Sequence, residues 1–138
     1  MFRFIALPLA LVIAFAVHAE TPKDVIAGYA REAARSQPGF SASAERGRDL
    51  FVRKWNVTDR MPNCASCHTE RPDNAGSHVI TAKPIKPLAP AANPERFSSL
   101  TKVEKWFRRN CTEVVGRACS AAEKADFVQF LATAGGEW

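Results

Sequence analysis

The clearest chemical signal in the sequence is a short segment with two cysteines and a histidine. Cys64, Cys67 and His68 occur in the order Cys-Ala-Ser-Cys-His, and this C-x-x-C-H spacing is the attachment signature of c-type haem. Two intervening residues let both sulfurs form thioethers with the vinyl groups on one porphyrin edge, while the adjacent imidazole binds the iron. We therefore predict one covalent haem c, held by Cys64 and Cys67, with His68 as the proximal ligand.

Two other chemistries use paired cysteines, and the rest of the chain favours neither. A structural zinc site needs a second pair of ligands at short spacing, but Cys111 and Cys119 are widely spaced and no histidine lies near them. A thioredoxin-like dithiol follows a strand and opens a helix, whereas proline-rich segments flank Cys64. Haem attachment is the interpretation that accounts for the motif.

An electron-transfer cytochrome needs a second axial ligand, usually methionine or histidine. No methionine follows the motif, and Met61 lies just before Cys64, on the tether beside the attachment edge. His78 is the other histidine downstream of the apolar N-terminus, and its polar Gly-Ser loop is typical of a solvated side chain. Met61 and His78 are therefore weak candidates.

Asn110 is a stronger candidate, because the helical period places it on one face with Val103, Trp106 and Phe107. A buried amide on an apolar face needs a partner, and leaving it unpaired costs about 1 to 3 kcal/mol. Iron is one such partner, since an amide oxygen is a hard donor that suits ferric better than ferrous iron. The alternative is that Asn110 caps the C-terminus of its helix. The spacing alone leaves both interpretations open.

The N-terminus has the pattern of a secretory signal peptide. Arg3 precedes an apolar run over residues 4–17, and a small-residue cleavage site ends at Ala19. The run is shorter than the roughly 20 residues that cross a bilayer. We expect residues 1–19 to be removed on export, leaving residues 20–138 as a single periplasmic domain without stable membrane insertion.

Cys111 and Cys119 remain, and they flank a short turn between predicted helices. Thiols outside the cytosol are usually oxidised, so in an exported protein this pair is expected to form a disulfide. Two buried free thiols are the alternative.

Composition limits the classes of protein that this chain can form. It has 138 residues, of which 46% are hydrophobic and 24% charged, as in one globular domain. The net charge of +5 is mildly basic. Without a dense run of lysine and arginine or interleaved aromatic residues, it gives little support for nucleic-acid binding and favours acidic partners.

Helical signals bracket a long irregular segment. A first helix is predicted from Pro22 to a stop before Pro38, and a second over residues 44–52. Gly47 inside the second helix marks a close helix crossing, unless this glycine is merely tolerated. Residues 57–94 show no sustained period, so we predict a loop that the haem organises.

Two further helices are predicted after the irregular segment, each opened by a capping box. Thr101 and Glu104 form the first box, Ser120 and Glu123 form the second, and a Gly-Gly pair at 135–136 ends the last helix. No alternating strand pattern or internal repeat occurs. The predicted class is all-α.

Several segments together carry a family resemblance. They are Lys83-Pro84-Ile85, Pro87-Leu88-Ala89-Pro90, Asn93-Pro94-Glu95-Arg96-Phe97, the run from Lys102 through Arg108-Arg109-Asn110-Cys111, Gly116-Arg117-x-Cys119, and Glu123-Lys124-Ala125-Asp126. On these segments the chain resembles the sphaeroides haem protein (SHP) family of monohaem cytochromes c, from about Ala27 to Leu131.

The resemblance implies a class I cytochrome c-like fold, a small helical protein around one weakly ligated haem. It implies that Asn110 binds ferric iron and leaves on reduction, and that Cys111 and Cys119 form a neighbouring disulfide. It further implies binding of oxygen and nitric oxide, and electron supply from a dihaem or other c-type cytochrome.

These observations favour an exported haem protein that accepts an electron and then binds a small gas at the position that Asn110 vacates.

A conventional electron-transfer cytochrome is one alternative, but this chain has no methionine downstream of the motif. A nitric oxide- or peroxide-converting enzyme is another, and it needs a distal acid or base such as Arg109 or His78; for Arg109, solvation or pairing with a haem propionate is the commoner role. The basic residues of the same helix are candidates for docking an acidic electron donor, and a merely solvated face is the alternative; they are Lys102, Lys105, Arg108 and Arg109.

Overall fold

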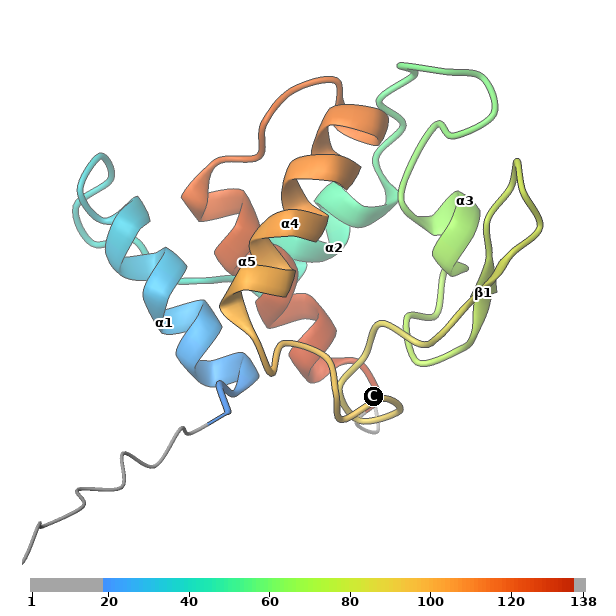
Figure 1. Cartoon of the computed structure of the whole chain (residues 1–138). Helices are drawn as coiled ribbons and strands as arrows, with labels where there is room; N and C mark the ends of the chain where they lie inside the picture. Colours follow the sequence, from blue (N-terminus) through green and yellow to red (C-terminus); the bar gives the residue numbers. More distant parts are fainter. Residues whose placement is uncertain (1–18, 136–138) are drawn as a thin grey trace, which may run out of the picture.

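Four main helices form the fold of the described residues (Figure 1). The structure is a computed structural model that describes residues 19–135. Its main helices are α1 (Pro22–Ala33), α2 (Ala44–Val52), α4 (Leu100–Asn110) and α5 (Ala121–Thr133). The prediction of an all-α protein is confirmed. The predicted signal peptide, except for its last residue, and the second glycine of the 135–136 pair lie outside the described residues.

Helix α5 lies at the centre of the fold, with α1 and α2 packed against it. Its buried residues are Ala125, Asp126, Val128, Phe130 and Leu131. Phe51 of α2 is fully buried and its ring centroid lies 6.0 Å from that of Phe127 and 5.5 Å from that of Phe130. Tilted aromatic pairs at this spacing stabilise a core beyond simple burial.

Gly47 confirms the predicted close crossing of α2 and α5. A Cβ atom at this position would collide with the backbone carbonyl of Asp126. The carboxylate of Asp126 is itself buried, and it accepts hydrogen bonds from the backbone N–H of Ser43 and from Nε of Arg46, both at 2.7 Å. The two helix backbones meet at the glycine, and the ion pair beside it holds the crossing.

Capping differs between the last two helices. The predicted box opens α5, where the backbone N–H of Glu123 donates to the Ser120 hydroxyl at 3.2 Å. The box predicted for Thr101 and Glu104 is wrong, because α4 already begins at Leu100 and Thr101 lies inside it.

Glu104 is engaged by two other helices instead. The Tyr29 hydroxyl of α1 donates to its Oε1 at 2.5 Å, and Nζ of Lys124 on α5 donates to both carboxylate oxygens at 3.0 Å. Hydrogen bonds from a cation to a carboxylate are stronger than those from neutral donors. Burial raises the pKa of Glu104, but these two donors outweigh it and leave the pKa below its ordinary value. One carboxylate therefore ties α1, α4 and α5 together.

The irregular middle segment contains three short elements that the sequence pattern does not reveal. They are a helical turn, α3 (Ala65–His68), and two antiparallel strands, β1 (Gly76–Ser77) and β2 (Pro84–Ile85). Proline lacks a backbone N–H and is rare inside strands, so Pro84 conceals the hairpin. The rest of the predicted loop is irregular, as expected.

Candidate haem site

The C-x-x-C-H segment folds into α3, which begins directly after Cys64. Asn63 holds this turn, because its Oδ1 accepts hydrogen bonds from the backbone N–H and the hydroxyl of Ser66, at 2.9 and 2.7 Å. Its Nδ2 donates to the carbonyl of Val52 at 2.9 Å, which joins α3 to the end of α2. This role was not predicted, although asparagine just before a short helix is a typical capping signal.

The hairpin packs directly against the backbone of α3 (Figure 1). A Cβ atom at Gly76 would collide with the carbonyl oxygen of Cys67, so glycine is needed for β1 to lie this close. The backbone N–H of Val79 donates to Sγ of Cys67 at 3.5 Å. Asn63 before α3 and the hairpin after it thus position both cysteines.

Cys64, Cys67 and His68 are brought together, half-buried, in one turn. Neither Cys64 nor Cys67 forms a disulfide in the described chain. Burial raises the pKa of Cys64 to about 12. Burial also lowers the pKa of His68 to about 4, with a further contribution from the charge of Arg96. At neutral pH the imidazole is therefore uncharged, which is the form that binds a metal. The two cysteine sulfurs lie in the same turn, as thioether attachment of haem requires.

His78 lies in the hairpin, where its side chain closes the turn. Its Nδ1 accepts hydrogen bonds from the backbone N–H groups of Ile80 and Thr81, at 3.2 and 3.3 Å. An Nδ1 that accepts hydrogen bonds leaves the proton of a neutral ring on Nε2. Neither ring nitrogen then offers a free lone pair to iron, which weakens His78 further as a candidate for the second axial ligand.

Asn110 is the last residue of α4 but does not cap it. Its φ and ψ are −70° and −37°, and the chain continues into a π-helical turn, η1 (Cys111–Val115), which Gly116 closes with a φ of +79°. The C-cap interpretation of Asn110 is therefore wrong. The Asn110 side chain is exposed and has no hydrogen-bond partner within residues 19–135.

The predicted apolar face of α4 divides into two strips. Val103, Phe107 and Cys111 are buried in the core, whereas Trp106 and Asn110 are exposed. Residues four apart lie along one line on a helix, so the two strips are neighbouring lines of this kind. The prediction that Trp106 and Asn110 share one face with Val103 and Phe107 is therefore wrong, and the exposed line is the one that a bound group can cover.

The disulfide between Cys111 and Cys119 fixes the end of α4 to the start of α5. Both cysteines are buried, and their Cα atoms lie 5.8 Å apart. The backbone N–H of Gly116 donates to the carbonyl of Cys111 at 3.0 Å and completes the π-helical turn. Such turns are rare and often occur at functional sites, and this one directly follows Asn110.

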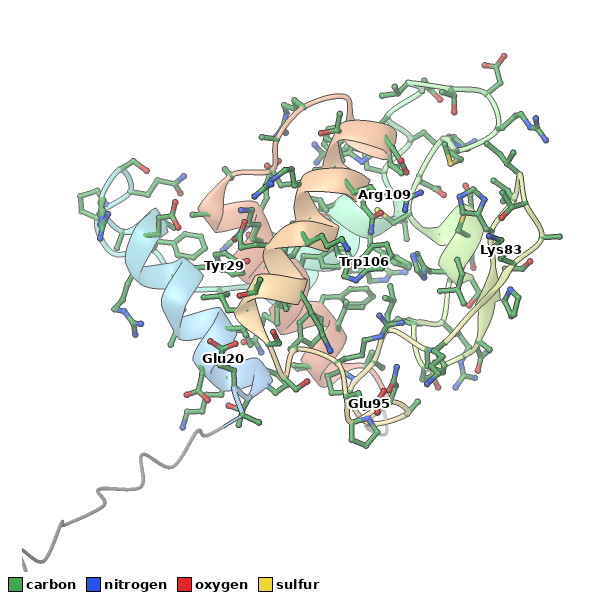
Figure 2. The ribbon with its side chains drawn as sticks, in the orientation of Figure 1. Glu20, Tyr29, Lys83, Glu95, Trp106 and Arg109 are labelled. Atoms are coloured by element: carbon green, nitrogen blue, oxygen red, sulfur yellow. A yellow bond between two sulfur atoms is a disulfide. The ribbon has the colours of Figure 1, made fainter. Side chains whose placement is uncertain are left out.

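Trp106 and Arg109 lie on the side of α4 toward α3 (Figure 2). Trp106 is 49% exposed, which is unusual for so large an apolar side chain. The guanidinium of Arg109 lies 5.8 Å from its ring centroid, and Nε of Arg109 forms an ion pair with Glu113 at 3.0 Å. Arg109 is thus already paired. The exposed Trp106 ring and the exposed Asn110 amide lie next to each other on α4, and this surface fits a flat apolar group.

The described part of the chain gives no support for a bare metal site. Within residues 19–135, no three His, Cys, Asp or Glu side chains are arranged to hold an ion. In the same range no helix has the length and apolar character needed to span a membrane.

A helical fold with two thiols and a neutral imidazole in a C-x-x-C-H turn defines the class of c-type cytochromes. A family profile described as a domain of unknown function (DUF1924) matches residues 37–131. The cytochrome c-type protein SHP of Cereibacter sphaeroides is 42% identical over 133 residues, which are 96% of this chain and 98% of the relative. Cytochrome c'' of Methylophilus methylotrophus is 35% identical over 127 residues, 88% of each chain. The chain belongs to the SHP family of c-type cytochromes.

Solved structures of both relatives share the fold. Oxidised SHP, described as an oxygen-binding cytochrome c, matches with a TM-score of 0.73 and 44% identity over 83% of this chain and 98% of its own. Oxidised cytochrome c'' from Methylophilus methylotrophus matches with a TM-score of 0.76 and 36% identity over 82% of this chain and 94% of its own. The predicted cytochrome fold is confirmed.

Proposed function

We propose that this monohaem cytochrome carries one haem c on Cys64 and Cys67, with His68 and Asn110 as axial ligands. In this proposal residues 20–138 form a single domain, exported to the periplasm by the signal peptide, which accepts electrons and binds oxygen or nitric oxide. The observation that carries the proposal is the Asn110 amide, which ends α4 without capping it and has no partner in the described chain.

When bound, the haem supplies an iron that exchanges one electron and, in the ferrous state, takes a diatomic ligand. Cys64 and Cys67 would hold the porphyrin edge; Asn63 fixes the turn that carries them, and the hairpin contacts the sulfur of Cys67. His68 offers an uncharged ring nitrogen.

The Asn110 amide is a hard oxygen donor, so it binds ferric iron better than ferrous iron. We expect Asn110 to bind in the oxidised protein and to withdraw in the reduced protein. The Cys111–Cys119 disulfide and the π-helical turn restrain the backbone beside it. Asn110 therefore acts as a ligand that the oxidation state controls, and its withdrawal leaves room for a small gas.

An acidic redox partner, such as a dihaem cytochrome, is expected to dock on the exposed side of α4. Arg109 pairs with Glu113, so the exposed cations of α4 that have no acidic partner in the described chain are Lys102, Lys105 and Arg108. Positive charge near the haem attracts an acidic donor and orients it.

The enzyme alternative has less support than gas binding. Nitric oxide or peroxide conversion needs a free acid or base near the iron. The two candidates are engaged, Arg109 by Glu113 and His78 by the backbone of its own turn. We therefore favour electron transfer and gas binding over a dedicated enzymatic activity.

Visible spectra of the purified holoprotein test this proposal. We expect the ferrous protein to show high-spin bands and to bind carbon monoxide rapidly, because Asn110 has withdrawn. A low-spin ferrous spectrum that carbon monoxide does not change would instead identify a conventional electron carrier.

A further inference from the structure

Arg96 is a half-buried arginine that the backbone holds in place. Its Nε donates to the carbonyl of Pro87 and its Nη2 to the carbonyl of Lys86, both at 2.8 Å. Asn93 donates to the same Pro87 carbonyl at 3.2 Å. Two fixed donors leave the planar guanidinium little freedom, and its Nη1 has no hydrogen-bond partner within residues 19–135.

Arg96 has no carboxylate partner in the described chain, which separates it from several other arginines. The arginines that form ion pairs are Arg46 with Asp126, Arg71 with Asp73, Arg109 with Glu113, and Arg117 with Glu123. The neighbouring Glu95 lies 3.8 Å from Nζ of Lys86 instead. A partly buried charge is unfavourable without an opposite charge, so Arg96 is suited to an anion from outside the chain.

Arg96 also lies near the attachment turn, because Phe97, which follows it in the chain, packs against the same buried cluster as Cys64 and Ala65. The next residue, Phe97, has a φ of +62°, which is uncommon for a bulky side chain. The Phe97 ring packs against both buried core clusters. Such backbone strain persists where the surroundings fix it, and it often occurs at functional sites.

We propose that Arg96 binds a propionate carboxylate of the haem and acts as a positioning residue for the porphyrin. The inference rests on the proposed function, because the haem brings the anion that the described chain does not supply. A guanidinium already held by two carbonyls keeps N–H groups free for a charge-assisted hydrogen bond to a carboxylate. It also places a positive charge near the iron.

Arg96→Gln and Arg96→Lys in the holoprotein test the proposal, with Arg71→Gln as the matched control. Arg71 follows the same C-x-x-C-H turn but is exposed and paired with Asp73.

In Arg96→Gln the resonance Raman propionate-bending band should shift, and the reduction potential should fall because ferric iron loses a nearby repelling charge. The pH dependence of that potential should move to higher pH, because the propionate pKa rises. Arg96→Lys should restore the potential in part, and Arg71→Gln should leave the band unchanged.

An unchanged propionate band and pH profile in Arg96→Gln would overturn the proposal. Equal loss of thermal stability in both Arg96 variants, with a wild-type band, would also overturn it and show that Arg96 only ties the loop at residues 86–87. The proposed function is tested separately by mass spectrometry of the wild-type protein. A mass without covalent haem would contradict that function. A failed Arg96 test in a protein that carries covalent haem therefore leaves the proposed function intact.

Discussion

As the proposed distal ligand, Asn110 would differ from the usual distal ligands of c-type cytochromes, because it offers a neutral oxygen rather than a sulfur or an imidazole nitrogen. The residue lies at the junction between α4 and a π-helical turn, with its amide exposed. Trp106, one helical turn earlier, is the exposed apolar neighbour on the same line of the helix. A weak polar ligand beside an apolar surface favours reversible ligation.

Asn110→Ala should change the ferric visible spectrum, because the iron then takes water or stays five-coordinate. The ferrous spectrum should change little and carbon monoxide should bind at least as fast, since the amide has already withdrawn there. The reduction potential should rise as ferric iron loses its stabilising donor. His78→Ala is the control, because its ring closes the hairpin turn. The opposite pattern, with only His78→Ala changing the ferric spectrum, would transfer the distal role to His78.

At the scale of elements, the hairpin of β1 and β2 directly contacts α3, the turn that carries the C-x-x-C-H residues. The absence of a side chain at Gly76 lets β1 contact the backbone of α3 at Cys67. The amide of Val79 reaches the sulfur of the same cysteine. The hairpin therefore packs against the attachment turn and restrains its position.

Gly76→Ala should lower the free energy of unfolding by about 2 kcal/mol or more, because the new methyl group meets backbone that cannot rotate away. It should also change the Soret circular dichroism as the turn shifts. Gly28→Ala is the matched control, since its Cβ meets nothing within 4 Å in α1; it should leave the haem signal unchanged and stabilise the fold by up to about 1 kcal/mol. A wild-type Soret signal in Gly76→Ala would contradict this account.

Local signals could be predicted from the sequence, and so could the close helix crossing at Gly47, but the partners in long-range contacts could not. The C-x-x-C-H spacing and the Ser120 cap depend on neighbours within a few residues, so both were predicted and the cap is confirmed by the structure. The false capping box at Glu104 arose because the true partners of that carboxylate lie on other helices. The backbone contacts of Arg96 were not predicted for a similar reason, since its acceptors lie nine and ten residues away.

At the scale of the whole molecule, the basic side of α4 should govern association with an acidic electron donor. Electron-transfer rates should fall as ionic strength rises, because salt screens long-range attraction. Lys105→Glu should slow the reaction several-fold at low salt, whereas Lys23→Glu, an equal charge change on exposed α1, should have little effect. Stopped-flow reduction by an acidic c-type cytochrome measures both. Equal rates for the two variants would place docking elsewhere.

The Tyr29–Glu104–Lys124 network links the global stability to pH, because three helices meet at one carboxylate. The folded-state pKa of Glu104 lies below its ordinary value of 4.5, so the network stabilises the fold fully above about pH 4.5 and loses this contribution as the pH falls through the folded pKa. Glu104→Gln should therefore lower the free energy of unfolding by about 1 kcal/mol at pH 7, a figure reduced for partial exposure of the pair.

Denaturant unfolding of the two holoproteins from pH 7 to pH 3 measures this difference. The curves should converge at low pH, because protonated glutamic acid and glutamine are both neutral hydrogen-bonding groups. Glu32→Gln is the control, since this exposed α1 carboxylate forms no ion pair within residues 19–135. If the free energies of unfolding of wild type and Glu104→Gln differ by the same amount at every pH, the contribution of Glu104 to packing α1, α4 and α5 comes from its shape and not from its charge.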